Sequence, residues 1–455
     1  MVCNAGELTD KDFYIYTNII MAIKFKTVEW AAAANVYEVN VRQYTPEGTL
    51  AAFQKELPRL RDMDISILWF MPLTPISLEK RQGTLGSYYA CSNYHEVSKE
   101  FGSAADFKNL VSSAHEQGFK VIIDWVANHT GWDHIWTKEH PEFYKRDNEG
   151  NFYDANGWVD VIDLEYSNKQ LREVMVAEMS FWIKEFDIDG FRCDMAHLVP
   201  LDFWSNARTK LDAQKELFWL AESEEPKYHE VFDATYAWEL LHTMEALSKH
   251  NASLQDFKNV LEKYEIAFPP NALRLLFTSN HDENSHSGSE YERLGEGLQA
   301  FAALCATWKN SLPLIYSGQE MPNKKRLQFF DKDPIEWTGQ YLLQDFYKTL
   351  FSLRKSCSAL RAGDSTVSTS IINTDAPQNI FAFLRKHEKN EVLVMLNLSN
   401  SSMLRFKITE ENINEKFTNA FSGIETDVNR ETYFEMQKWE YQVYFKNIQN
   451  LQNHD

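Results

Sequence analysis

Cysteine is scarce in this sequence of 455 residues, and its five cysteines lie far apart along the chain. They are odd in number and form no Cys-x-x-Cys pair, which excludes a disulfide framework and a thiolate zinc site. The five positions are Cys3, Cys91, Cys193, Cys305 and Cys357. Unpaired cysteines of this kind are typical of a reducing compartment, so we expect a cytoplasmic protein.

Positive charge is also in short supply, with 46 Lys and Arg residues against 66 Asp and Glu residues and a net charge of −20. Such a surface repels nucleic acids and anionic membranes, and we expect neither as a partner. Long apolar runs are missing too, because no run reaches the roughly 18 residues that span a bilayer. The partly apolar stretch 13–23 follows acidic residues rather than basic ones, which argues against a signal peptide. Met21 is a second plausible start, and we expect residues 1–25 to be an N-terminal extension.

The remaining composition is that of a globular protein, with 44% apolar residues, 17 glycines and 13 prolines. Aromatic residues are plentiful at 14%. Flat rings with polar edges fill protein cores, and they also suit a cleft that stacks on sugar rings.

Short apolar runs alternate with amphipathic stretches from residue 36 to about residue 320. Several runs are apolar without alternation, which is typical of strands buried on both faces of a parallel sheet. The predicted strands are residues 36–41, 66–70, 120–125, 190–194, 217–222, 233–236, 275–280 and 313–317, and helical patterns between them include 49–63, 103–117, 167–186 and 294–309. Eight strands separated by helices predict an α/β fold, a (β/α)8 TIM barrel. A doubly wound open sheet is the alternative, but no glycine-rich phosphate loop follows the first strand.

Two further parts of the chain depart from this alternation of strands and helices. Residues 129–165 form a long, aromatic connection after the third strand, which predicts a small lid over the active face. From residue 361 to residue 447, strand-length alternating runs follow one another without helices, which predicts an antiparallel β-sandwich. We therefore expect a catalytic barrel at 26–360, a C-terminal sandwich at 361–447 and a tail at 448–455.

Polar side chains follow four of the predicted strands, and the carboxyl ends of parallel barrel strands meet at one face. They are Asp124, Asn128 and His129, then Arg192 and Asp194, then Glu222, and finally His281 and Asp282. A single acid at a strand end is usually a cap or a salt-bridge partner, and Asp124 is interpreted as such a structural residue. The joint set favours a catalytic site, because burying so many charges is costly unless they are paired or used.

Three acids from separate strands suit the cleavage of glycosidic bonds. This reaction needs one carboxylic acid to protonate the leaving oxygen and one carboxylate to attack or to activate water, about 5–5.5 Å apart when configuration is retained. Arg192 lies two residues before Asp194, hence on the same side of its strand, where it can keep that aspartate ionised as a nucleophile. No Gly-x-Ser-x-Gly elbow, His-Glu-x-x-His pair or P-loop offers another chemistry.

Four sequence blocks resemble, in order, the four signature regions of the α-amylase family of glycoside hydrolases. They are Asp-Trp-Val-Ala-Asn-His at 124–129, Gly-Phe-Arg-Cys-Asp-Met-Ala-His at 190–197, Leu-Ala-Glu-Ser at 220–223 and Ser-Asn-His-Asp at 279–282. Residues 161–165 and 316–320 add to the likeness, which spans residues 35–320. The resemblance implies a retaining barrel enzyme that cleaves α-1,4-glucosidic bonds in starch-derived glucans or maltooligosaccharides.

Carried over residue by residue, the resemblance implies that Asp194 is the nucleophile, Glu222 the general acid/base and Asp282 the third carboxylate. The substrate-binding residues it implies are Tyr89, His129, Arg192, His197 and His281. The chain departs from the family pattern at Asn93, where an aspartate is common, and after Asp194, where the familiar Lys-His pair is absent. These departures leave the contacts to the leaving group undefined.

A calcium ion lies near the lid in many members of the family, and the resemblance implies Asn128 and Asp163 as its ligands. Two oxygen ligands fall short of the six to eight that calcium takes. The alternative is that Asn128 simply hydrogen-bonds the lid. We expect no organic cofactor.

Several functions stay open beside an α-glucan hydrolase. The same acids serve an α-glucosyl transferase or isomerase, of the disproportionating or trehalose-forming kind, and an exo-acting α-glucosidase. A catalytically silent glycan-binding scaffold is the alternative of another class, since a fold does not imply function. The presence of all three acids and both histidines argues against a catalytically silent scaffold.

The length of the lid predicts how a substrate chain binds. The lid spans about 36 residues, and so small a lid favours an open cleft that binds chains at internal positions. Its aromatic residues are candidates to stack on successive sugar rings, or else form the lid's own small core. They are Trp132, Trp136, Phe152, Tyr153 and Trp158.

Overall fold

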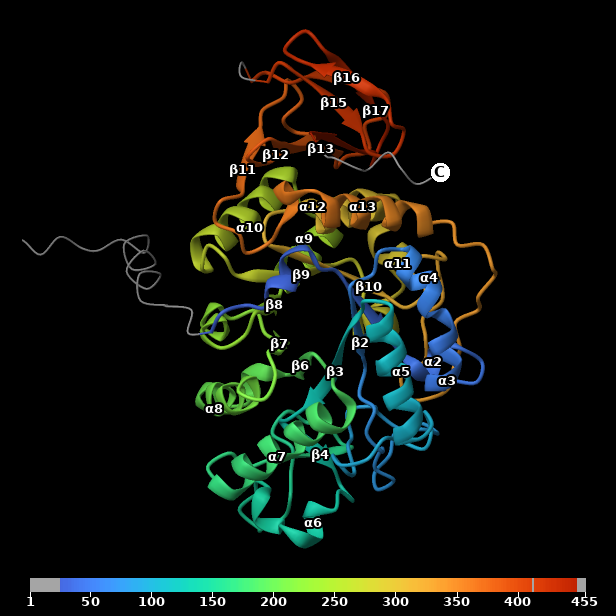
Figure 1. The fold of residues 1–455 in the computed structure, drawn as a ribbon, viewed down its shortest axis with the longest axis vertical. Helices are drawn as coiled ribbons and strands as arrows, with labels where there is room; N and C mark the ends of the chain where they lie inside the picture. Colours follow the sequence, from blue (N-terminus) through green and yellow to red (C-terminus); the bar gives the residue numbers. More distant parts are fainter. Residues whose placement is uncertain (1–24, 411–412, 448–455) are drawn as a thin grey trace, which may run out of the picture.

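The computed structural model describes residues 25–410 and 413–447 (Figure 1). Most of the predicted N-terminal extension, with Cys3 and the second start at Met21, lies outside the described residues, as does the tail at 448–455. The boundaries expected at 25/26 and 360/361 stay predictions.

Eight parallel strands close into a barrel, which confirms the predicted fold and excludes the open sheet. Around the barrel the order is β1, β10, β9, β8, β7, β6, β3, β2. Their bounds are β1 (Val36–Val39), β2 (Ile67–Phe70), β3 (Lys120–Val126), β6 (Gly190–Asp194), β7 (Phe218–Ala221), β8 (Ala234–Tyr236), β9 (Leu273–Phe277) and β10 (Ser311–Tyr316). Each lies within a few residues of a predicted strand, because full burial on both faces leaves an unbroken apolar run in the sequence.

Helices surround the barrel and cover its outer face (Figure 1). They are α2 (Val41–Tyr44), α3 (Leu50–Phe53), α4 (Leu57–Asp62), α5 (Ala104–Glu116), α7 (Lys169–Phe186), α8 (Leu201–Asp212), α9 (Trp238–Ser248), α10 (Leu254–Ala267), α11 (Glu290–Leu294), α12 (Leu298–Thr307) and α13 (Gln344–Ser356). The helix expected at 49–63 is broken into α3, a 3-10 turn and α4. The helices expected at 103–117, 167–186 and 294–309 correspond to α5, α7 and α12.

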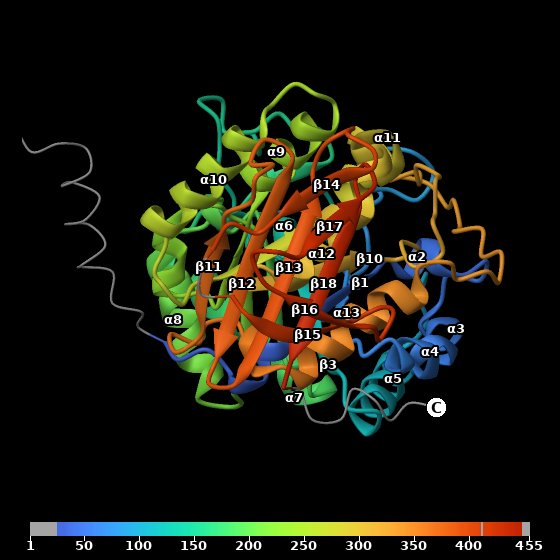
Figure 2. The ribbon, with the colours of Figure 1, turned by 90° about the horizontal axis from the view of Figure 1, so that it is seen from above.

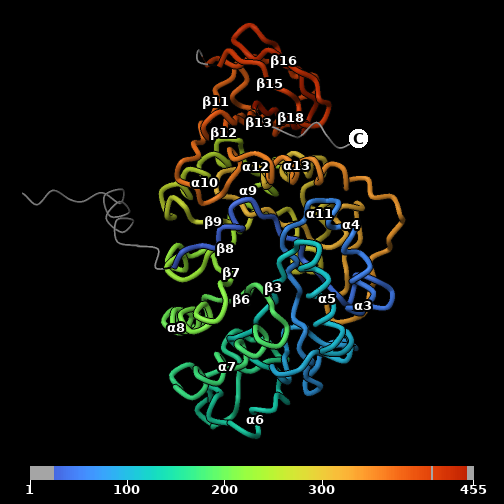
Figure 3. Tube along the Cα trace, viewed as in Figure 1, coloured from blue at the N-terminus to red at the C-terminus, as the bar shows by residue number. Residues whose placement is uncertain are grey.

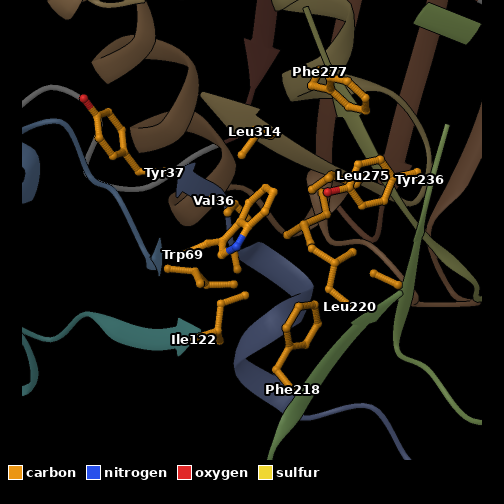
Figure 4. Packing of buried hydrophobic residues seen from close by; sticks show 14 of the residues in the cluster. Val36, Tyr37, Trp69, Ile122, Phe218, Leu220, Tyr236, Leu275, Phe277 and Leu314 are labelled. Carbon is orange, nitrogen blue, oxygen red and sulfur yellow. The ribbon is translucent and has the colours of Figure 1, made fainter. Parts of the chain in front are cut away.

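The inside of the barrel is a packed apolar core below the active face. Side chains two residues apart on a strand lie on the same side, so every second residue points inward. Figure 4 shows the inner layer, with side chains from several strands gathered around one indole: Val36, Trp69, Ile122, Leu220, Leu275 and Leu314. The next inward positions, two residues further along the strands, carry polar residues, including Glu38, Asp124 and Glu222.

The lid is held at its base by a short antiparallel pair, β4 (His129–Gly131) and β5 (Val161–Asp163). Between them lie α6 (Trp136–Glu139) and a 3-10 turn, η3 (Pro141–Phe143). Figure 3 shows this lid at the end of the molecule opposite the C-terminal strands. The pairing brings residues 30 to 34 positions apart into register, with His129 opposite Asp163.

The C-terminal part is antiparallel, as predicted. Its six-stranded sheet has the order β11, β12, β13, β18, β15, β16, and a second sheet pairs β14 with β17. The bounds are β11 (Ser368–Ile372), β12 (Ile380–His387), β13 (Asn390–Asn397), β14 (Leu404–Lys407), β15 (Glu415–Asn419), β16 (Glu425–Val428), β17 (Tyr433–Met436) and β18 (Tyr441–Lys446). Figure 2 shows the larger sheet lying over α12, which contacts β13 and β18.

Four cysteines lie in the described part of the chain, and each is free and buried. Among the described residues, no helix is both long and apolar enough to cross a membrane.

Candidate active site

The carboxyl ends of the barrel strands surround a hollow of about 320 Å³. Five of the residues expected in the site line it together: Tyr89, His129, Asp194, Glu222 and Asp282. They come from separate strands and connections, so closure of the barrel is what gathers them.

Arg192 is fully buried beneath this hollow and approaches three carboxylates. Its Nη1 donates to Asp194 Oδ1 at 2.9 Å and to Asp124 Oδ1 at 3.0 Å. Its Nη2 lies 2.9 Å from Glu222 Oε1 but makes no hydrogen bond, so this approach has ion-pair distance without hydrogen-bond geometry. The guanidinium therefore forms ion pairs with both Asp194 and Glu222, and it favours the charged form of each.

Asp194 and Glu222 are two buried carboxyl groups that compete for protons. Burial raises the pKa of each to about 7, and Arg192 opposes the rise in both. The charge of Asp194 raises the pKa of Glu222 further. Groups coupled in this way titrate as a pair, so near neutral pH the two carboxyls hold about one proton between them.

Asp282 differs from these two in being ionised at any ordinary pH. Its Oδ2 lies 3.2 Å from Nε2 of His281. Burial disfavours the charge of Asp282, but the His281 imidazole lowers the pKa of Asp282 to about 2. The Asp282 side chain is 38% exposed to the hollow, so it is a fixed negative charge that a bound molecule can reach.

Asp124 is placed as the sequence suggested, beneath the site rather than in it. Its side chain is fully buried and accepts hydrogen bonds from Arg192, from Trp69 Nε1 at 3.3 Å and from the Tyr89 hydroxyl at 3.2 Å. Burial raises the pKa of Asp124 to about 6, against the effect of Arg192. Asp124 holds Arg192 and Tyr89 in position.

Aromatic rings form two walls of the hollow. Tyr89 stacks on His281 with ring centroids 5.5 Å apart and on Phe329 at 6.2 Å. Across the hollow, Trp158 of the lid meets His129 edge to face at 5.4 Å. Burial lowers the pKa of His129 to about 4, so its imidazole is neutral at pH 7 and can hydrogen-bond to an uncharged hydroxyl.

Sequence reasoning missed several lining residues, among them His286, Phe329 and Phe330. His286 lies in η6, a π-helical turn (Glu283–Ser287) just after Asp282. The two phenylalanines lie in an irregular segment after β10, at 322–342. The Phe-Phe pair within a polar loop was the sole signal in the sequence, and nothing local linked it to the barrel face.

His197 is not brought into the hollow. Its ring is exposed, and Nδ1 lies 3.4 Å from the backbone oxygen of Glu222. His197 therefore lies on η4 (Ala196–Leu198), next to the backbone of Glu222 and outside the lining of the hollow.

The lid aromatics divide between core and cleft. Trp158 lines the hollow. Trp136 is buried and packs against Phe143, and Phe152 packs against Tyr144, so these rings form the lid's own core. The indole of Trp132 lies under the Lys80 ammonium.

The residues expected to hold calcium do not fit that ion. Asp163 is buried, and its Oδ2 is bound by Lys145 Nζ at 3.0 Å and by the Ala155 amide at 3.3 Å. Its Oδ1 accepts from Asn128 Nδ2 at 3.4 Å. A lysine ammonium thus already neutralises the carboxylate, and in the described part of the chain no group of three His, Cys, Asp or Glu side chains is arranged to hold a metal.

Comparison with known proteins identifies the family of this chain. A model of the alpha-amylase catalytic domain matches residues 20–155 and 143–338. An alpha-amylase of Haloarcula japonica is 27% identical over 387 residues, and the match covers 81% of this chain and 56% of that protein. This chain therefore spans little more than half the length of that relative.

Two solved structures are similar over nearly their whole length. A noncanonic maltogenic alpha-amylase from Thermotoga neapolitana superposes with a TM-score of 0.83 at 30% identity, covering 91% of this chain and 99% of that one. An alpha-amylase from Lactobacillus plantarum superposes with a TM-score of 0.81 at 26% identity, covering 91% and 99%. With a family model that matches more than half of its length, the chain belongs to the alpha-amylase family.

Proposed function

We propose that the protein hydrolyses α-1,4-glucosidic bonds in starch-derived glucans or maltooligosaccharides and retains the anomeric configuration. Asp194 is the nucleophile, Glu222 the general acid/base and Asp282 the third carboxylate. The observation that carries the proposal is the position of Asp194 and Glu222, which line one hollow with Asp282 and both lie 2.9 Å from the Arg192 guanidinium. This arrangement prepares one ionised and one protonated carboxyl, as a retaining glycosidase requires.

The first half of the reaction forms a glycosyl ester on Asp194. Its carboxylate attacks the anomeric carbon while the proton of Glu222 passes to the glycosidic oxygen, and the carbon–oxygen bond breaks. In the second half, Glu222 takes a proton from water, and the hydroxide attacks the anomeric carbon and releases Asp194. Asp282 lines the hollow, where it can hold sugar hydroxyls through both steps.

The walls of the hollow suit a neutral, ringed substrate. Tyr89, Trp158 and Phe330 present aromatic faces or edges to the hollow, which favour contact with the apolar faces of sugar rings. The net charge of −20 disfavours anionic ligands and leaves neutral glucans acceptable. The alpha-amylase relatives support the same substrate class.

Product analysis on maltoheptaose tests this proposal. We expect short maltosaccharides, with the α-anomer formed first. Predominance of longer oligomers or of trehalose would replace hydrolysis with glucosyl transfer or isomerisation. Binding of maltooligosaccharides without release of reducing sugar from any α-glucan would favour a silent scaffold.

We also propose that the protein works in a reducing compartment. Four free thiols are buried in the described residues, and Cys193 lies directly beside Asp194. Oxidation there would disturb the nucleophile. Cell fractionation tests this, and recovery of the protein from the growth medium would contradict it.

A further inference from the structure

One buried carboxylate at the active face has no part in the reaction described above. Glu38, on β1, is fully buried, and its Oε1 lies 2.5 Å from Nδ1 of His281. Its second oxygen, Oε2, is buried without a hydrogen-bond partner. On the other side of the same imidazole, Nε2 lies 3.2 Å from Asp282 and 2.6 Å from the Tyr89 hydroxyl. One ring therefore lies between two carboxylates.

We infer that Glu38 is a positioning residue of the active site, which keeps His281 doubly protonated so that its Nε2–H always faces Asp282. The link to catalysis rests on the proposed function, because Asp282 is the carboxylate that would hold the sugar. The ion pair itself does not depend on that function.

Hydrogen-bond geometry supports the double protonation. The Tyr89 hydroxyl donates to Asp124 Oδ2 at 3.2 Å, and so it accepts at its 2.6 Å contact with His281 Nε2. That assignment puts a proton on Nε2. A second proton belongs on Nδ1, because that nitrogen faces a carboxylate oxygen at 2.5 Å. A neutral imidazole would leave one nitrogen lone pair facing an anion.

The charges around His281 include some that favour its imidazolium form and one that opposes it. Glu38 on β1, Asp124 on β3 and Asp282 favour the imidazolium, whereas Arg192 on β6 opposes it. Tyr89 contacts Nε2, and His286 on η6 faces Asp282. Burial lowers the pKa of His281, but Asp282 and Glu38 together raise it well above its ordinary value.

The fold places Glu38 well for this purpose. Its strand position pairs with Trp69 on one side and Tyr316 on the other, so the Glu38 backbone is fixed in the barrel wall and its side chain points inward. The Trp69 ring also meets the His281 ring edge to face at 6.0 Å. A glutamine at this position would keep the size of the side chain and remove its charge.

Nuclear magnetic resonance of 15N-histidine-labelled protein tests the inference without substrate. The two ring nitrogens of His281, assigned by their loss in His281→Asn, should both show the shifts of protonated nitrogens at pH 7 and at pH 8. In Glu38→Gln, we expect the titration of His281 to move to lower pH by about one to three pH units. Glu290→Gln is the matched control, since Glu290 is equally buried but bonds Gln319 and Thr278 instead.

Activity supplies the second measurement. In Glu38→Gln, the basic limb of kcat/KM should begin at lower pH than in the parent and in Glu290→Gln, because loss of a proton from His281 adds to the ionisation of Glu222. Glu38→Asp keeps the charge and should retain the imidazolium at pH 7. If Glu38→Gln fails to fold, Glu38→Asp is the variant that tests the inference.

Three results would overturn the inference: a neutral His281 in the parent at pH 7, an unshifted titration in folded Glu38→Gln, or identical pH profiles in that variant and the parent. If the spectra behave as expected but the protein cleaves no α-glucan, the proposed function fails and the ion pair stands.

Discussion

The backbone amide of Met195 donates a hydrogen bond to Glu222 Oε2 at 2.7 Å. Met195 follows Asp194 directly and has left-handed backbone angles, φ 41° and ψ 44°. This conformation is costly for a residue with a side chain, and it turns the chain sharply as it leaves β6. The proposed acid is therefore tied by one amide to the residue beside the proposed nucleophile, which fixes their relative position.

Replacing either carboxylate should abolish most of the activity. We expect Asp194→Asn and Glu222→Gln each to lower kcat by about a thousandfold or more, because each removes an interaction made mainly in the transition state. On a glucosyl fluoride, whose leaving group needs no proton, Glu222→Gln should recover much of its first step and Asp194→Asn should not. Asp202→Asn and Glu225→Gln are exposed controls of the same chemistry. Retention of a tenth of the parent kcat by Asp194→Asn would contradict the assignment.

The pH dependence of kcat/KM should be bell-shaped around neutrality. Burial raises the pKa of both Asp194 and Glu222 to about 7, and the coupled pair is active when it holds one proton. Lowering the pH protonates Asp194 and gives the acid limb, whereas raising it ionises Glu222 and gives the basic limb. Glu222→Gln, assayed on the fluoride, should lose the basic limb and keep the acid limb. An optimum below about pH 4 would contradict this reading of the pair.

Chelation should leave the protein unchanged. Because Lys145 already neutralises Asp163, neither EDTA nor added calcium should shift the midpoint of thermal unfolding. Lys145→Met should lower the free energy of unfolding by about 1–2 kcal/mol, since it leaves a buried carboxylate without its cation, though partial exposure of the lysine reduces the loss. Lys108→Met, which removes an exposed ion pair with Glu185, is the control. A lower midpoint after EDTA treatment would show a metal site instead.

Trp158 should carry a large share of substrate binding by the lid. We expect Trp158→Ala to raise KM for maltoheptaose about tenfold with little change in the unfolding midpoint, because the side chain is half exposed and lines the hollow. Trp132→Ala removes an indole from the same lid, outside the lining of the hollow, and should leave KM nearly unchanged. Equal effects of the two substitutions would place the binding face elsewhere.

A maltoheptaoside blocked at its non-reducing end should be cut internally. The small lid predicts a cleft that admits chains at internal bonds, and we expect release of the chromogenic end from the blocked substrate. If the blocked substrate stays intact while maltose or maltotriose is hydrolysed quickly, the enzyme is an exo-acting α-glucosidase.

The barrel could be predicted because its signals are local. A strand buried on both faces leaves an apolar run, and a helix on the outside leaves a 3.6-residue period, so each element is visible within its own few residues. The polar residues at the strand ends followed from the same reasoning, since closure of a parallel barrel always brings those ends together. The sequence therefore predicts that Asp194, Glu222 and Asp282 lie at one face of the barrel.

Other parts of the site depend on contacts between distant segments, which no local pattern records. The pairing of β4 with β5, each three residues long, is too short to leave a period, and so the role of Lys145 at Asp163 was invisible. Phe329 and Phe330 reach the hollow from an irregular segment, and His197, adjacent in sequence to the site, turns away from it.

The sequence by itself determined the barrel, the β-sandwich and the carboxylates at the active face, because apolar periodicity and strand direction suffice for these. Only the tertiary structure decided which charges meet. Glu38 and His281 are 243 positions apart, and the Arg192 guanidinium meets Asp124 and Glu222, which come from other strands. Protonation in a buried cluster depends on distances of a few ångströms between separate strands, and those distances exist only once the barrel has closed.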